Sequence, residues 1–411
     1  MHLLFSLLLA VSIPPQHTIE AKGVLRDYSH PKHAGDFYEE TLQVTIAADV
    51  DRDAMALTFG EDRFLLRGHD LFTIEGAELK PADSIGDLRR TTVAKLNPLY
   101  VMSLAGKLDV IARGDELWRV KRGRDGTIEA IETTVKHDLY GELPEVVRYE
   151  QWLDRGGFRF PARITVHEGT RMKAQLDITA IRSVMNDELV RASRADRHAI
   201  YDEDIAFREL APHLFAIELK PSDSRVFIAE FADYLFVIEG AYNDRNVSRI
   251  AARIRERFAG KPIRYFSFSH IHGQYVGGVR TYVSGGARVV TTPTGAAVVK
   301  EIAGVDSEVV SASRTFEDAT NAMTVYNVDS QHTDDYFVFY FPRTKLLLAG
   351  DLLCVRGPDK PLRGRSKHLC ETIRKLGISV DRIQITWPME GYGCISPVSF
   401  EDFAKACEVP E

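Results

Sequence analysis

The chain has few cysteines, and none of them is placed for a structural zinc knuckle. Its 411 residues contain four, and no two are spaced as Cys-x-x-Cys. If the protein is exported, an even number of cysteines permits disulfides, with three ways of pairing them. The alternative is that they are small buried hydrophobes. The pairing therefore stays open for Cys354, Cys370, Cys394 and Cys407.

No apolar run is long enough to span a membrane as a helix. The longest, residues 3–13 at the N-terminus, is too short for that but matches the core of a signal peptide, with Ala10 and Ser12 near its end. No Lys or Arg precedes it, only His2. We expect residues 1–16 to be a signal peptide and the protein to be exported, to the periplasm or outside the cell. The alternative is a buried or frayed N-terminal segment.

The chain also lacks an excess of positive charge. It has 52 Lys and Arg against 59 Asp and Glu, a formal net charge of -7, and the basic residues are scattered. This argues against a nucleic-acid partner. The partner that we expect is a small-molecule substrate. With 45% hydrophobic and 27% charged residues the composition is that of a soluble globular protein, and the length predicts two domains. The oligomeric state is not indicated.

Residues 18–190 alternate between apolar and polar positions in short stretches broken by turn residues. This predicts an antiparallel β domain, with one helical interruption around residues 87–105. The stretch 160–166, Phe-Pro-Ala-Arg-Ile-Thr-Val, resembles the curved sheets of lipoprotein-carrier-type domains, although no residue roles follow from that. We find no cluster of catalytic groups in this half.

The polar, aperiodic residues 191–206 are expected to be a linker. Beyond them, in residues 207–411, apolar runs alternate with segments of helical spacing, which predicts a layered α/β domain. Residues 334–335 and 363–367 are expected to be solvated loops, with Arg363 and Arg365 facing an anionic substrate as the alternative. Strands are expected at 234–238, 263–268, 289–290, 323–328, 336–341, 345–349 and 383–387, and helices at 243–258, 295–302 and 399–407.

Two histidines lie one residue apart, His270 and His272, directly after the apolar run 263–268. A turn leaving a buried strand can aim both imidazoles at one point, and a borderline metal ion is the usual reason for that arrangement. His332, Asp351 and Glu390 also follow predicted strands. Ligands collected from strand ends on one rim of a sheet suit a metal site.

This pattern resembles the metallo-β-lactamase superfamily and its His-x-His-x-Asp-His signature. The resemblance extends over residues 207–407, about half of the chain, and implies an αββα sandwich. It includes the glycine pair at 277–278 and the Gly-Asp pair at 350–351. By this resemblance His270, His272 and His332 would be the three histidines of the first metal site, and Asp351 the carboxylate that bridges two metals.

The chain departs from the family pattern at the second metal site. Gln274 and Tyr275 stand where the family has Asp-His. The last family histidine falls on Glu390, which we prefer, or on Tyr392, depending on which turn residues are aligned. An amide and a protonated phenol are poor metal ligands. The resemblance therefore implies one metal ion rather than two.

The resulting interpretation is a mononuclear zinc hydrolase in which a metal-bound water attacks an ester, thioester, lactone or related bond. Asp351 would be a ligand or orienting carboxylate, the base would be Asp351, Glu390 or the bound hydroxide itself, and Tyr275 would donate to a developing oxyanion. One alternative is Fe²⁺ bound by His270, His332 and Asp351, as in the persulfide dioxygenases of the same superfamily. Another is a binding protein without turnover. The fold does not select the substrate.

Overall fold

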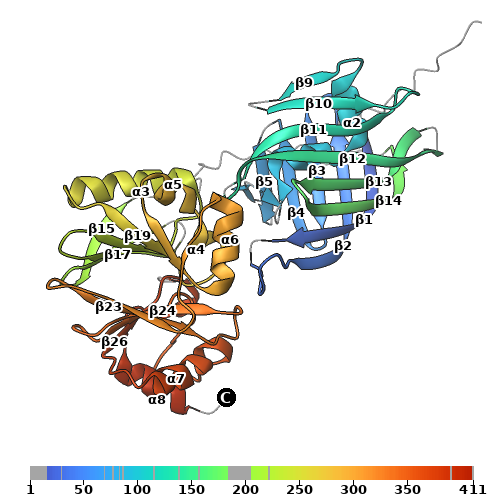
Figure 1. Ribbon diagram of the computed structural model, residues 1–411. Helices are drawn as coiled ribbons and strands as arrows, with labels where there is room; N and C mark the ends of the chain where they lie inside the picture. The colour runs from blue at the N-terminus through green and yellow to red at the C-terminus, as the bar shows by residue number, and fades with distance from the viewer. Residues whose placement is uncertain are drawn as a thin grey trace, which may run out of the picture. The chain divides into compact units, whose positions relative to one another are not determined.

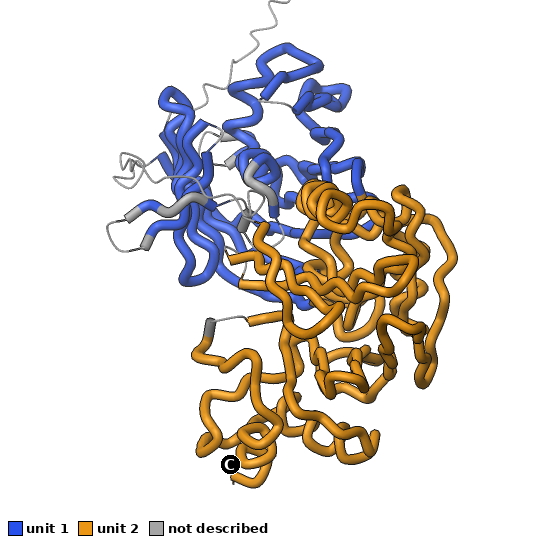
Figure 2. The backbone as a smooth tube through the Cα atoms, turned by 90° about the vertical axis from the view of Figure 1, so that its left-hand side faces the viewer, with its two compact units in different colours: residues 1–28, 38–137, 141–197 blue, residues 29–37, 138–140, 198–411 orange. Residues whose placement is uncertain are grey.

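The structure is a computed structural model of the chain. It describes residues 16–28, 30–68, 70–75, 78–82, 84–85, 88–113, 116–137, 139–155, 158–183, 205–220, 223–388 and 391–409. The described chain forms two compact units (Figure 2): residues 1–28, 38–137 and 141–197 make unit 1, and residues 29–37, 138–140 and 198–411 make unit 2. The expected signal segment up to residue 15, most of the expected linker, and Glu390 lie outside the described residues.

Unit 1 is built on a 12-stranded sheet in which every neighbouring pair is antiparallel, as the alternating pattern predicted. The strand order is β6-β5-β4-β3-β2-β1-β14-β13-β12-β11-β10-β9 (Figure 1), so the first and last strands of the unit pair with each other. The strands are β1 (Gln16–Asp27), β2 (Tyr38–Asp49), β3 (Ala54–Phe59), β4 (Asp62–Arg67), β5 (Asp70–Glu75), β6 (Glu78–Ala82), β9 (Val110–Arg113), β10 (Glu116–Arg122), β11 (Ile128–His137), β12 (Gly141–Arg155), β13 (Phe158–Glu168) and β14 (Arg171–Arg182), with β7 (Ser84–Ile85) and β8 (Leu88–Arg89) forming a separate pair.

Two short helices, α1 (Arg90–Lys95) and α2 (Pro98–Ala105), interrupt the strands in the region where a helix was expected. They pack with the sheet in one hydrophobic cluster. A buried ion pair joins Lys95 to Glu145, with Nζ 2.6 Å from Oε1, and Glu116 Oε2 lies 3.2 Å from the same nitrogen. Because each charge here has a partner, we assign this cluster a structural role.

Unit 2 contains two mixed sheets. The first has seven strands in chain order: β15 (Ala206–Ala211), β16 (Leu214–Leu219), β17 (Ser224–Glu230), β18 (Leu235–Ile238), β19 (Ile263–Ser267), β20 (Arg288–Thr291) and β21 (Glu308–Val309), parallel from β18 onward. The second has six: β22 (Ser313–Glu317), β23 (Ala322–Val328), β24 (Tyr336–Phe341), β25 (Leu346–Leu348), β26 (Arg382–Gln384) and β27 (Val398–Ser399), with only β25 and β26 parallel.

Three hydrophobic clusters show where the helices of unit 2 pack. One contains residues of both sheets, among them Phe236 and Phe339. A second joins the seven-stranded sheet to α3 (Asp244–Arg257), α4 (Gly273–Val276), α5 (Val279–Ser284) and α6 (Pro293–Ala303). The third joins the six-stranded sheet to α7 (Gly364–Leu376) and α8 (Phe400–Glu408). The sequence predicted α3, α6 and α8 from their apolar spacing.

Helix α7 corrects one expectation. Residues 363–367 were expected to be a solvated loop, but the helix begins at Gly364 and Arg363 is its N-cap. The sequence hides this start because the side chain of Arg363 makes no capping hydrogen bond and a glycine follows it. The first fully apolar buried position is Leu369, more than a turn into the helix.

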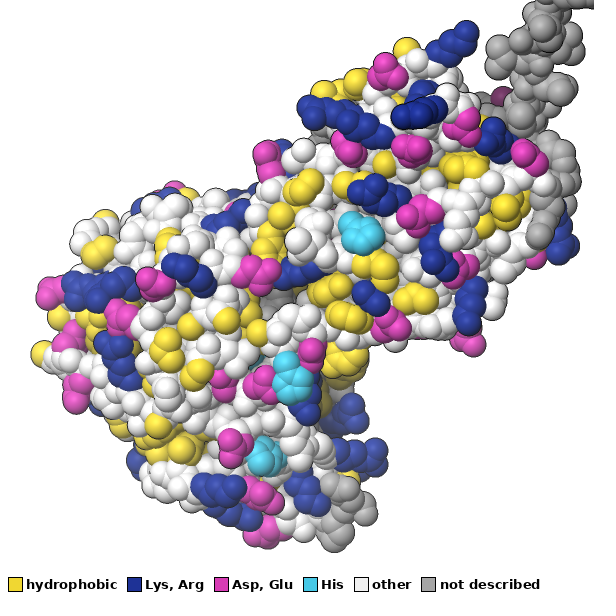
Figure 3. Space-filling view, turned by 45° about the vertical axis from the view of Figure 1, so that its right-hand side comes forward, with side chains coloured by type: hydrophobic (Ala, Val, Ile, Leu, Met, Phe, Trp, Pro, Cys, Tyr) yellow, Lys and Arg dark blue, Asp and Glu magenta, His cyan; other side chains and the backbone are white. Residues whose placement is uncertain are grey.

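The cysteines pair within unit 2, as Cys354–Cys394 and Cys370–Cys407. Both bridges tie segments around the six-stranded sheet. On the face shown in Figure 3, basic and acidic side chains are interspersed, in keeping with the scattered charges of the sequence. No helix in the described parts of the chain has the length and apolar character that a membrane crossing needs.

Candidate metal centre

The first two histidines of the centre lie in the turn between β19 and α4. Gly277, directly after α4, lets the chain pack against the segment that leads into α3, because a Cβ on Gly277 would lie 2.2 Å from the carbonyl oxygen of Tyr242. The backbone N–H of Phe337, in β24, donates to the carbonyl of Ser269 at 2.7 Å. The turn is therefore fixed to both sheets of unit 2.

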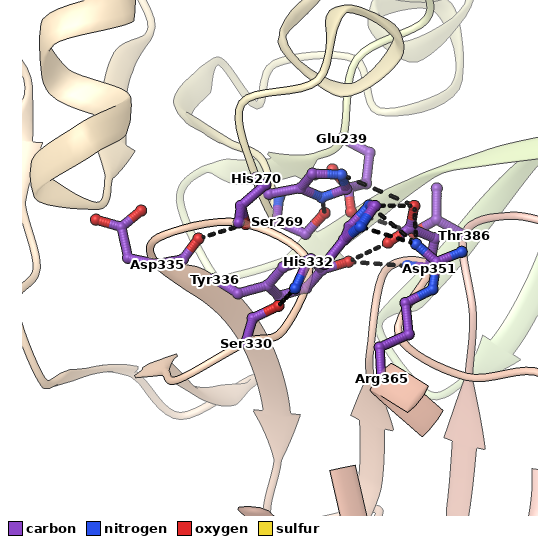
Figure 4. Close-up of polar contacts among 11 residues, drawn as sticks. Glu239, Ser269, His270, Ser330, His332, Asp335, Tyr336, Asp351, Arg365 and Thr386 are labelled. Carbon is purple, nitrogen blue, oxygen red and sulfur yellow. Dashed lines mark hydrogen bonds and ion pairs between the residues drawn. The ribbon is translucent and has the colours of Figure 1, made fainter. Parts of the chain in front are cut away.

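Four side chains of ligand type converge in unit 2: His270, His272, His332 and Asp351. His332 follows β23 and Asp351 follows β25, so the group draws on both sheets. One candidate ligand atom from each residue lies within 4.8 Å of all the others. The imidazole centroids are 4.2 Å apart for His270 and His272, 4.9 Å for His270 and His332, and 4.6 Å for His272 and His332. Figure 4 shows His270, His332 and Asp351 facing one another.

The buried imidazoles leave two nitrogens free for a ligand. Both rings are buried, and His270 Nε2 and His272 Nδ1 have no hydrogen-bond partner among the described residues. Burial lowers the pKa of His270 well below its usual value and that of His272 to about 3, with the neighbouring His332 also lowering the latter. Both rings are therefore neutral at physiological pH, which is the state that binds a metal. An unpaired buried nitrogen is costly without a ligand, so these residues fit a metal ion.

Asp351 is held in place by Tyr336, a residue whose sequence context predicts a strand position and no role in the site. The phenol hydroxyl donates to Asp351 Oδ1 at 2.9 Å and accepts the Asp351 backbone N–H at 2.9 Å. Gly350 makes this approach possible, because its φ is 55° and a Cβ there would lie 2.0 Å from the Tyr336 hydroxyl. The tyrosine fixes one carboxylate oxygen and leaves the other to face the histidines.

The second carboxylate oxygen, Asp351 Oδ2, lies 3.8 Å from His270 Nε2, 3.3 Å from His332 Nε2 and 3.4 Å from Arg365 Nη1. Burial alone would raise the pKa of Asp351. The nearby His270, the hydrogen bond with His332 and the positive charge of Arg365 outweigh burial and hold that pKa well below its usual value. The carboxylate is therefore ionised over the whole physiological range.

Glu239 is a buried residue that holds the backbone next to His270. It follows β18, is buried, and accepts the Ser269 N–H at 3.0 Å and the Thr386 hydroxyl at 3.2 Å. Ser269 Oγ lies 2.9 Å from His270 Nδ1, so a proton on Nδ1 would leave the lone pair of Nε2 for a ligand. Burial raises the pKa of Glu239 to about 7, against the opposing effect of the Ser269 N–H.

The positions that depart from the family pattern have different surroundings. Tyr275 is buried with its ring centroid 4.5 Å from that of His270, and its hydroxyl has no partner within the described part of the chain. Burial and the nearby Asp351 raise the pKa of Tyr275 well above 10, so the phenol stays protonated. Tyr392 is 69% exposed, with its ring 5.3 Å from that of Trp387. Gln274 is half-buried, and Glu390 is not among the described residues.

Segment 29–37, which belongs to unit 2, also reaches the centre. The ring of His30 lies 5.0 Å from that of His272 in an edge-to-face arrangement. The backbone carbonyl of Lys32 accepts the Asp334 backbone N–H at 3.2 Å, and His33 pairs with the Asp334 carboxylate. Residues 334–335 were expected to be a solvated loop, but Asp334 contacts this segment.

Sequence reasoning missed two residues of the centre, Glu239 and Tyr336, and it missed the contacts of Arg365 with His332 and Asp351. Glu239 carried the signal that was used for the others, because it directly follows a continuous apolar run. Tyr336 carried no such signal, since a tyrosine within an apolar strand is usually a core residue. For Arg365 the sequence indicates, as an alternative to a solvated loop, only that it faces an anionic substrate.

Comparisons with known proteins give structural similarity alone. No protein-family model matches the chain, and no curated protein matches it in sequence. It is similar to a metallo-beta-lactamase from Pontibacter korlensis, with 14% identity, a TM-score of 0.41, and coverage of 50% of this chain and 98% of that one. It is also similar to a metallo beta lactamase from Hirschia baltica, with 17% identity, a TM-score of 0.38, and coverage of 50% of this chain and 99% of that one. A third similar structure is the metallo-beta-lactamase FIM-1 from Pseudomonas aeruginosa in the mono-zinc form, with 14% identity, a TM-score of 0.37, and coverage of 50% of this chain and 95% of that one. The metal centre is inferred from this chain's own side chains, independently of these similarities.

Proposed function

We propose that the protein is a mononuclear zinc-dependent hydrolase of the metallo-β-lactamase superfamily, acting on an ester, thioester, lactone or related bond of a small molecule. One observation carries the proposal: two buried, neutral imidazoles present nitrogens that have no hydrogen-bond partner among the described residues, and they lie beside a third imidazole and an ionised carboxylate. Three histidines with an open fourth position make an adequate catalytic zinc site.

The residues divide into ligands and supporting groups. His270, His272 and His332 would hold the ion, and Asp351 would be a fourth ligand or an orienting carboxylate. Zinc in such a set supplies a water nucleophile at neutral pH by lowering the pKa of that water to about 7. Since the pKa of Asp351 lies far below neutrality, this carboxylate is a weak base, which favours its role as ligand.

Tyr275 is suited to donate a hydrogen bond and not to bind metal. Its hydroxyl is protonated, buried, and unpaired among the residues that the structure describes. A buried donor without an acceptor is costly in the resting protein. We propose that it donates to the oxygen on which charge develops during hydrolysis.

The superfamily assignment is supported by the layout of unit 2 and by where the ligands lie. The hydrophobic clusters follow the order helices, seven-stranded sheet, six-stranded sheet, helices, as an αββα sandwich requires. Each candidate ligand lies in the loop that comes after a strand. We propose that this domain spans residues 207–411 and follows the β domain of residues 18–190.

The iron alternative uses His270, His332 and Asp351 and leaves His272 without a role. Because His272 Nδ1 is buried beside the other candidate ligands and no described residue pairs with it, a three-histidine set describes the centre better. Three histidines favour zinc, whereas two histidines and one carboxylate favour Fe²⁺.

Metal content tests the proposal. The protein purified without chelators should contain about one zinc per chain by mass spectrometry, and His270→Ala and His272→Ala should lose it. Zinc-loaded protein should hydrolyse 4-nitrophenyl esters, and the two variants should not. Iron with O₂ uptake would support the oxygenase instead. A protein that takes up no metal on reconstitution would be a binding protein on this scaffold.

We also propose that the protein is exported, with residues 1–16 removed. The apolar run at the N-terminus and the two disulfides support this, because disulfides persist in oxidising compartments. The intact mass of protein recovered from the periplasm or medium tests it. A full-length mass, or recovery in the cytosol only, would contradict export.

A further inference from the structure

Arg365 brings a positive charge into the candidate metal centre. It is the second residue of α7, and its guanidinium Nη1 lies 2.9 Å from His332 Nε2, 3.2 Å from His332 Nδ1 and 3.4 Å from Asp351 Oδ2. Figure 4 shows the side chain extending from the helix toward both residues. The side chain is 32% exposed, so solvent and small solutes can reach it.

The guanidinium contacts the same atoms that a metal ion would use. Nη1 lies beside both ring nitrogens of His332, one of which a metal ion would use. Asp351 Oδ2, which Nη1 also contacts, is the oxygen that faces the histidines. A metal ion bound by His332 and Asp351 would therefore compete with Arg365 for the Asp351 carboxylate and for the space beside the imidazole.

Arg365 keeps its charge when these contacts are lost, because arginine stays protonated. Among the described residues, the carboxylate that it contacts is Asp351. With a divalent ion present, one carboxylate would face two cations. The guanidinium would then need a further anion, and its planar fork matches a carboxylate or a phosphate.

We propose that Arg365 is the anion-binding, specificity-determining residue of the centre, and that the substrate carries a carboxylate or phosphate group close to the bond that is cleaved. Gln274 and Tyr275 are poor ligands for a second metal ion, and Arg365 supplies the positive charge that such an ion would have brought. This inference rests on the proposed function, since it requires the three histidines to bind a metal. It adds the chemical class of the substrate and the residue that selects it.

Two binding measurements test this without relying on turnover. The first is the zinc affinity of the metal-free protein, from competition with a chromogenic chelator. The second is the affinity of the zinc-loaded protein for inorganic phosphate and for acetate, by calorimetry at constant ionic strength. The variants are Arg365→Gln, Arg365→Lys and, as a matched control, Arg363→Gln. Arg363 is an exposed arginine two residues earlier whose side chain caps nothing.

Arg365→Gln should bind zinc about tenfold more tightly, because a competing cation is gone, and should bind the preferred anion at least about tenfold more weakly. Arg365→Lys should be intermediate for the anion, since a lysine keeps the charge but not the fork. Arg363→Gln should match the wild type in both. Whether phosphate or acetate binds more tightly to the wild type identifies the anionic group of the substrate.

Equal anion affinities of Arg365→Gln and the wild type would overturn the inference while leaving the zinc hydrolase standing. So would a wild-type protein whose zinc-loaded form binds neither anion. If wild type and control take up no zinc, the proposed function fails first, and the two failures are thereby distinguished. Unchanged thermal unfolding of Arg365→Gln would show that the variant is folded.

Discussion

Replacing Tyr336 with phenylalanine isolates the contribution of one hydroxyl to the metal centre. The ring itself stacks on His270, with centroids 4.7 Å apart and an interplanar angle of 19°, and phenylalanine keeps that contact. The substitution removes only the hydroxyl, which donates to Asp351 Oδ1 and accepts the Asp351 N–H. Both groups of Asp351 are then left in a buried place without those partners.

The expected cost follows from those two hydrogen bonds. A hydrogen bond to a charged group contributes roughly 1.5–3 kcal/mol, and a buried group left unsatisfied costs about 1–3 kcal/mol. We therefore expect the free energy of unfolding of the metal-free protein to fall by about 2–3 kcal/mol. Because Asp351 also loses its orientation, zinc affinity should fall by about 10–100-fold, as for other residues that orient metal ligands.

Tyr340→Phe is the matched control. Tyr340 lies on the same strand, β24, and its hydroxyl donates to the carbonyl of Ser379 at 2.6 Å, away from the metal ligands. It should lose about 1 kcal/mol of stability and no zinc affinity. Urea denaturation and chelator competition measure the two quantities. A Tyr336→Phe protein with wild-type zinc affinity would refute the assigned positioning role, whatever its stability.

Three further predictions concern other groups. In the folded protein Glu239 keeps its proton up to a pKa of about 7, whereas the unfolded chain releases this proton near pH 4.5. The wild type therefore loses stability as the pH rises from about 4.5 to 7.5. Over the same range Glu239→Gln should gain stability relative to the wild type, by up to about 3 kcal/mol. Urea denaturation of the metal-free proteins at both pH values checks this, and parallel pH profiles would contradict it. Tyr275→Phe should be about 1 kcal/mol more stable than the wild type, because it removes an unpaired buried hydroxyl, yet should hydrolyse esters more slowly at unchanged zinc content; equal rates would argue against the oxyanion role. The pair of substitutions Cys354→Ser and Cys394→Ser, and likewise Cys370→Ser and Cys407→Ser, should each lower the free energy of unfolding by about 3–4 kcal/mol, since the bridges close loops with sequence separations of 40 and 37; stabilities equal to that of the oxidised wild type would show that the bridges do not form.

The sequence predicted those parts of the fold that periodicity encodes. The alternation in the first half predicted the antiparallel sheet of unit 1, and the apolar face of Val247, Ile250 and Ile254 predicted α3. Helix α7 was missed because its first turn is polar and begins with a glycine. A helix whose buried face appears only after the first turn gives little sequence signal.

The candidate site could be predicted where chemistry and strand ends coincide in sequence. The pair His270 and His272 was recognisable because only two residues and a preceding apolar run define it. Tyr336 and Arg365 could not be placed, because their roles depend on how β24 and α7 meet the loop at Asp351 in three dimensions. Register and helix position are tertiary properties that local patterns do not record.

The origin of the ligands has a mechanical consequence for the whole unit. His270 and His272 come from the seven-stranded sheet, and His332 and Asp351 come from the six-stranded sheet. An ion held by all four would act as a cross-brace between the two halves of the core, and its binding free energy would add to the resistance of the unit to heat. The melting temperature would then report how much of the protein in a sample carries metal, before any substrate is known.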